Sequence, residues 1–223
     1  MAKTTTLDFL TQLRDNNSKD WFDQHRKQYD TAKADVITLM TDVLAGLERM
    51  DPAIAASQLV PKSCLFRINR DVRFSANKSP YKSNFGGWFN PGGKKSASAG
   101  YYVNIEPGNS FVAGGMYMPD PAVLTTIRQE IDYNFAGFEE MLDAPAFKKY
   151  YDGLSMEGAL VRPPKGYDAD NPAIDYLKLK SFTASHKLTN ETVLSDDLSE
   201  TVLAACAGLQ PLVAFLNRAL VTE

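Results

Sequence analysis

The chain has 223 residues and a formal net charge of −3, with 44% apolar and 23% charged residues. These values are those of a soluble globular protein, and no run of residues approaches the roughly 18–20 apolar residues of a membrane-spanning helix. We therefore expect no membrane partner.

Two further features indicate the cytoplasm. The N-terminus, MAKTTTLDFL, lacks the apolar core of a signal peptide. Cys64 and Cys206 belong to no disulfide or zinc spacing pattern. We expect a cytoplasmic protein that folds as one domain over residues 1–223, and the sequence leaves its oligomeric state open.

Two helices are predicted before the first strand. Apolar residues recur at helical spacing over Thr6–Leu13 and over Ser18–Met50, with Asn16-Asn17 between the two. Asp51-Pro52 ends the second helix, because proline disfavours helical backbone at the residue before it. His25 falls on the apolar face of this helix, where a place at the edge of the core is favoured over an acid/base role.

Strands dominate the middle of the chain. The turn Pro107-Gly108-Asn109 joins two of them into a hairpin. The strands predicted here are Ser63–Ile68, Phe85–Phe89, Ala99–Glu106 and Ser110–Tyr117.

The second half of the chain returns to helices. Asp120-Pro121 is a strong helix start, because aspartate caps a helix and proline suits its first turn. This helix runs to about Tyr133. Strands in the middle and helices around them predict an α+β fold, with a mainly antiparallel central sheet flanked by N-terminal and C-terminal helices. The remaining predicted elements are helices over Asn134–Leu142, Pro145–Tyr151 and Asn171–Tyr176, strands over Gly158–Val161 and Leu179–Leu188, and a final helix from a Ser195 cap to about Leu220.

Positive charge is concentrated in one segment. Arg67–Lys82, with the sequence RINRDVRFSANKSPYK, holds five cations and one acidic residue. The wider range Lys62–Lys95 holds eight cations and one acidic residue, a net charge of +7, so the rest of the chain carries −10. Such an uneven distribution of charge bears on the binding partners of the protein rather than on its fold. Apolar residues alternate with the cations and should hold this backbone against a core.

The chemistry of this segment indicates an anion-binding pocket. We expect Arg67, Arg70 and Arg73 to bind a phosphate or carboxylate group, because the planar guanidinium donates two hydrogen bonds to such groups. A second rigid basic turn, Arg162-Pro-Pro-Lys165, adds cations in a fixed direction. The candidate ligand-binding residues are Arg67, Asn69, Arg70, Asp71, Arg73, Lys78, Tyr81, Lys82, Arg162 and Lys165.

Motifs for other chemistries are missing. The two histidines and two cysteines show no metal-ligand spacing, so no metal site is predicted. The glycine-rich stretch Gly92–Ser96 fails as a phosphate-binding loop, because a strand rather than a helix follows it. We predict no cofactor, and the catalytic residues stay unknown because the sequence fixes no reaction. In an enzyme, Asp71 or His25 would be the general acid or base.

Four stretches carry a resemblance to a known family. They are FLTQLRDNNSKDWFDQHRKQYD, RINRDVRFSANKSPYKSNFG, GYYVNIEPGNSFVAGGMYMP and LVRPPKGYDADNPAIDYLKLKSF. Together they resemble the domain-of-unknown-function 2461 family of bacterial and fungal proteins over nearly the whole chain. The resemblance implies a single α+β domain. It supplies no catalytic residues.

Two alternatives to a small anionic ligand remain open. The wider segment Lys62–Lys95 has the cations and the stacking rings of a nucleic-acid-binding surface, the rings being Phe74, Tyr81, Phe85 and Trp88. A sequence pI of about 5.5 and the lack of any reader motif disfavour nucleic acid. The arginines could instead form a structural hub of ion pairs with distant carboxylates, or a docking face for an acidic protein.

Overall fold

A four-stranded antiparallel sheet forms the centre of the computed structural model, which describes residues 4–220. The strands follow chain order from one edge of the sheet to the other, and a long helical excursion separates the last two. The α+β prediction is confirmed. The strands are β1 (Phe85–Phe89), β2 (Gly100–Ile105), β3 (Ser110–Met116) and β4 (Phe182–Leu188).

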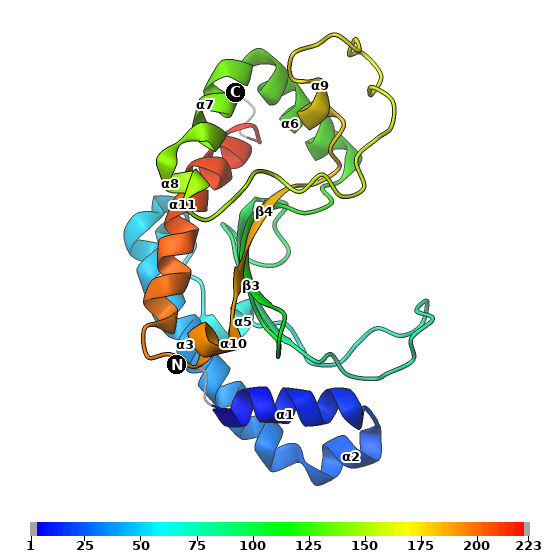
Figure 1. The fold of residues 1–223 in the computed structure, drawn as a ribbon, viewed down its shortest axis with the longest axis vertical. Helices are drawn as coiled ribbons and strands as arrows, with labels where there is room; N and C mark the ends of the chain where they lie inside the picture. Colours follow the sequence, from blue (N-terminus) through cyan, green and yellow to red (C-terminus); the bar gives the residue numbers. More distant parts are fainter. Residues whose placement is uncertain (1–3, 221–223) are drawn as a thin grey trace.

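Two long helices, α3 (Arg26–Met50) and α11 (Leu198–Arg218), cover one face of the sheet (Figure 1). A side chain on Gly87 of β1 would collide with Met40 of α3, and one on Gly114 of β3 would collide with Leu209 of α11. This covered face carries the large buried side chains of the core, because alternate residues of a strand point to the same face. They include Phe85, Phe89, Tyr101, Val103, Val112 and Phe182.

The opposite face of the sheet has loops rather than helices beside it (Figure 1). The strand register places Trp88 opposite Tyr102, and Tyr102 opposite Ala113, on this face. We call it the open face. Its residues are Gly86, Trp88, Tyr102, Asn104, Phe111, Ala113, Ser185 and Lys187.

The remaining helices lie around the ends of the sheet. Asp120 caps α6 as predicted, because its carboxylate accepts hydrogen bonds from the backbone N–H groups of Ala122 and Val123, each at 3.0 Å. The other helices are α1 (Thr4–Asp15), α2 (Lys19–Gln24), α4 (Pro52–Ala56), α5 (Pro61–Cys64), α6 (Pro121–Tyr133), α7 (Phe135–Asp143), α8 (Pro145–Lys148), α9 (Ile174–Leu177) and α10 (Asn190–Leu194).

Two predicted strands are wrong. In place of Ser63–Ile68 the chain forms the single turn α5, which begins at Pro61, and then an extended segment in which Leu65 bridges Gly87. Proline favours the first turn of a helix, and this outweighs the alternating pattern after it. Gly158–Val161 is a loop, in which Val161 is 95% exposed and has no neighbouring strand to pair with.

Two helix boundaries also differ from the prediction. The helix over Ser18–Met50 is interrupted at His25, which ends α2 and begins α3. Apolar spacing continues through this break, so periodicity could not reveal it. The final helix begins after Asp197, because Ser195 instead ends the short helix α10.

Helix α11 also meets the length and hydropathy criteria for a membrane span over Leu198–Arg218, which the sequence analysis did not identify. Half of the relevant window is buried inside the fold, as in the core helix of a globular protein. The hydropathy of α11 is therefore weak evidence for a membrane segment.

Candidate functional site

The basic segment forms an extension at the outer edge of β1. Backbone hydrogen bonds join Phe66 to Gly86 of β1, and Lys82 to Ile68 across the extension, each at 2.8 Å. Asn69 and Tyr81 form a further bridge between its two arms. The arms are thus tied together near the sheet, while the tip projects away from it (Figure 1).

Tyr81 anchors this extension to the N-terminal helices. Its ring stacks on Phe22 of α2 with centroids 4.0 Å apart. The side-chain amide of Asn17 bonds both the N–H and the carbonyl of Tyr81, at 3.0 Å each. Tyr81 is buried, and these contacts position the segment.

Cations at the tip have partners within the tip itself. Arg73 makes two hydrogen bonds to Asp71, at 2.9 and 2.6 Å, and these lower the pKa of the Asp71 carboxyl. Lys78 donates to the carbonyl of Val72 at 3.0 Å. Arg73 and Lys78 therefore have partners that hold the shape of the tip. The binding of one anion by Arg67, Arg70 and Arg73 together stays a prediction.

A different group of cations meets where the extension leaves the sheet. The Nζ atoms of Lys82 and Lys94 lie 5.4 and 5.2 Å from the centre of the Phe66 ring. Partial burial, and after it the positive charges of Arg67 and Lys94, lower the pKa of Lys82. We call Arg67, Lys82 and Lys94 the cation cluster. Within residues 4–220, none of the three forms an ion pair.

The cation cluster adjoins the open face of the sheet. The rings of Phe66 and Tyr102 lie 6.3 Å apart, and those of Tyr102 and Phe111 lie 5.7 Å apart. Tyr102 covers Gly86, where an added Cβ would meet its hydroxyl group. Partly exposed aromatic rings thus lead from the cluster onto β2 and β3.

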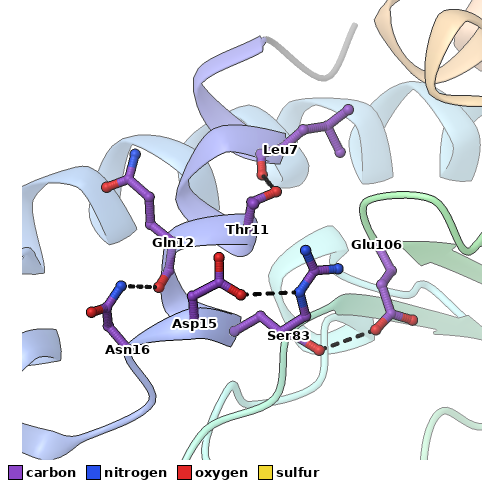
Figure 2. A network of polar contacts seen from close by, with 8 residues as sticks. Leu7, Thr11, Gln12, Asp15, Asn16, Ser83 and Glu106 are labelled. Carbon is purple, nitrogen blue, oxygen red and sulfur yellow. Dashed lines mark hydrogen bonds and ion pairs between the residues drawn. The ribbon is translucent and has the colours of Figure 1, made fainter.

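A polar network lies beside these rings. Asn104 is buried in β2 and accepts a hydrogen bond from Asn84 at 2.6 Å. Glu106 accepts hydrogen bonds from Ser83 at 3.1 Å and from Asn109 at 3.0 Å. Figure 2 shows the Ser83–Glu106 contact beside the end of α1. The Glu106 carboxylate thus accepts these hydrogen bonds from neutral donors.

Several predicted residues lie outside the cluster. Arg162 and Lys165 are exposed on the loop between α8 and α9, which lies apart from the basic extension (Figure 1). Arg70 lies farther along the extension, where its guanidinium is 3.5 Å from the Ser75 hydroxyl. Asn69 is exposed and contributes its backbone. Of the predicted set, only Arg67 and Lys82 belong to the cluster.

Sequence reasoning missed Lys94, Phe66, Tyr102 and Asn104 as site residues. In the sequence, Lys94 contributed only to the charge of the wider segment Lys62–Lys95. In the structure, its Nζ donates a hydrogen bond to the carbonyl of Leu65, 29 residues earlier, at 2.9 Å. The available signal was the alternation in β2, which places Tyr102 and Asn104 on one face.

The cation cluster lies outside two hollows of the molecular surface. Two surface hollows found in the described part of the chain lie elsewhere, one between α1 and α3 and one between α7 and α11. Neither contains a residue of the cation cluster. The anion-binding pocket expected from the sequence stays a prediction.

Other candidate groups lack the geometry for chemistry. The His25 ring stacks on Trp21 at 4.0 Å, and its Nδ1 lies 2.8 Å from the Trp21 carbonyl, as expected for a structural residue. Cys206 is fully buried, and this burial raises the pKa of its thiol to about 12. Residues 4–220 hold no group of three or more His, Cys, Asp or Glu side chains arranged to bind a metal ion.

A family model described as "Conserved hypothetical protein (DUF2461)" matches residues 5–215. The chain belongs to this family. Searches of curated proteins and of solved structures found no match. The cation cluster and the open face of this DUF2461 protein both lie within the matched residues.

Proposed function

We propose that this protein binds a small anionic ligand, with a phosphate or carboxylate group, through Arg67, Lys82 and Lys94. The observation that carries the proposal is that Lys82 and Lys94 share the Phe66 ring, while the charge of Arg67 helps to lower the pKa of Lys82. None of the three has an ion-pair partner among the described residues. Like charges held close together oppose folding, and a bound anion removes this cost.

The position of the cluster also supports the proposal. The backbone N–H of Phe66 donates to the Gly86 carbonyl of β1 at 2.8 Å. The backbone N–H of Lys82 donates to the Ile68 carbonyl on the other arm of the extension, also at 2.8 Å. Arg67 is exposed, and its guanidinium suits a planar or tetrahedral oxyanion. Cations that are held in place in this way lose less side-chain freedom when they bind.

The ion pairs argue against a structural hub. Of the arginines in the basic segment, Arg73 has an ion-pair partner in the described chain, and this is Asp71, two residues away. A hub would need carboxylates from distant segments. A docking face for an acidic protein remains the second candidate, and the exposed Phe74 at the tip, 96% accessible, favours it over the hub.

Titration with pyrophosphate and with citrate tests the proposal. We expect the Arg67→Ala variant to bind about 10- to 150-fold more weakly, because a hydrogen bond to a charged group contributes about 1.5–3 kcal/mol. Isothermal titration calorimetry at low salt measures this. The control is Arg49→Ala, which removes an exposed arginine from the far end of α3 and should bind normally. Equal binding by the wild type and Arg67→Ala would overturn the proposal.

A further inference from the structure

The open face offers an unusual surface next to the cation cluster. Phe66, Tyr102 and Phe111 form a row whose successive ring centres are 6.3 and 5.7 Å apart. Trp88 stands directly opposite Tyr102 on the same face. All four side chains are at least partly exposed.

Small residues keep the surface around this row low. Gly86 lies beneath Tyr102, and Ala113 is paired directly with Tyr102 on the next strand. Ser185 follows in the same line on β4, opposite Ala113. The Tyr102 ring itself covers Gly86, and the short side chains of Ala113 and Ser185 continue the open face beyond it.

Exposed aromatic rings on a rigid sheet are suited to stacking. They provide a large apolar area at little cost in side-chain freedom, and a flat ring that covers them removes this area from water. The row starts at Phe66, the ring that Lys82 and Lys94 share. A ligand held by the cluster would therefore extend over the row.

We infer that the ligand is a small molecule in which a flat aromatic ring is joined to a phosphate or carboxylate group. The anionic group binds Arg67, Lys82 and Lys94, and the ring packs against the row formed by Phe66, Tyr102 and Phe111, whose neighbouring planes are tilted by 54° and 44°. This inference rests on the proposed function and adds the ring to it.

Adenosine monophosphate, ribose 5-phosphate and adenosine separate the two parts of the ligand. We expect adenosine monophosphate to bind about 5- to 150-fold more tightly than ribose 5-phosphate, the range typical of stacking one base on an aromatic side chain. Adenosine should bind weakly, since it lacks the anionic group. Calorimetry with the full chain at low salt measures all three affinities.

The Phe111→Thr variant tests the role of the row. It should lose the preference for adenosine monophosphate and keep the affinity for ribose 5-phosphate. Phe111→Leu keeps more apolar volume and serves the same purpose if the threonine variant does not fold. The control is Phe74→Thr, which removes an exposed ring outside the row and should keep the preference.

The outcomes distinguish this inference from the proposed function. Equal affinity for adenosine monophosphate and ribose 5-phosphate would overturn the inference that the ligand carries an aromatic ring, and would leave the proposed anion site intact. Failure of both phosphates to bind would overturn the anion site itself. A preference for adenosine monophosphate that survives in Phe111→Leu would also overturn the role of the row.

Discussion

Replacing Lys82 with methionine is expected to abolish most anion binding while leaving the protein at least as stable as before. Methionine keeps the length and the apolar contact with Phe66, but it removes the charge. In the folded protein, burial and the neighbouring cations disfavour the charged form of Lys82 and lower its pKa. A neutral side chain at this position therefore removes the repulsion of Lys82 by Arg67 and by Lys94.

This pairing of lost binding with retained stability separates a ligand site from a structural one. Calorimetry with pyrophosphate and urea unfolding at pH 7 measure the two properties. Lys95→Met removes an exposed lysine next to Lys94 and should bind normally. A loss of about 3–5 kcal/mol in Lys82→Met would instead be typical of a buried charge pair left without its partner. That outcome would support the structural hub.

The lowered pKa of Lys82 has a consequence for pH dependence. The bound anion favours the protonated amine, so affinity should fall as the pH rises through the pKa of Lys82. Because this pKa lies below the ordinary value of 10.5, the loss should begin at a lower pH than for an ordinary lysine.

Replacing Gly115 with alanine is expected to remove a large part of the free energy of folding. Gly115 has φ of +116°, and a Cβ at this position would collide with the backbone carbonyl oxygen of Phe182 on β4. Strand pairing fixes this carbonyl, so it cannot move aside as a flexible side chain could. We expect a loss of about 3–5 kcal/mol from a total stability of roughly 5–15 kcal/mol.

Thermal unfolding of matched glycine variants measures this effect. The midpoint for Gly115→Ala should fall by about 6–20 °C, at roughly 2–4 °C per kcal/mol. Gly108→Ala is the control, because Gly108 also has positive φ, at +77°, but has open space around it. It should lose only about 1–2 kcal/mol from backbone strain. Equal losses in both variants would show that the close strand contact does not matter.

Local patterns predicted much of the fold. Alternation in Phe85–Phe89, the hairpin turn at Pro107-Gly108-Asn109 and the Asp120 cap each depend on residues close in the chain, and each prediction was correct. The strand predicted over Ser63–Ile68 failed because Pro61 starts a helical turn that the alternating pattern does not reveal.

The composition of the candidate site was harder to predict than its location. The charge count led to the correct neighbourhood, but it could not show which cations are already paired. Arg73 is neutralised by Asp71 within the tip, whereas Lys94 reaches the cluster only because β1 and the turn after it return the chain to Leu65. Alternation places Tyr102 and Asn104 on one face, but only the packing of α3 and α11 shows that this face is uncovered.

The most direct test of anion binding by the cation cluster is to locate a heavy oxyanion in crystals of the wild-type protein soaked in sodium tungstate. Its anomalous signal cannot be mistaken for water. An anion site at the cation cluster predicts an anomalous peak within hydrogen-bonding reach of the Arg67 guanidinium and the Lys82 and Lys94 ammonium groups, beside the Phe66 ring. A peak at Arg162 and Lys165, with none at the cation cluster, would contradict it.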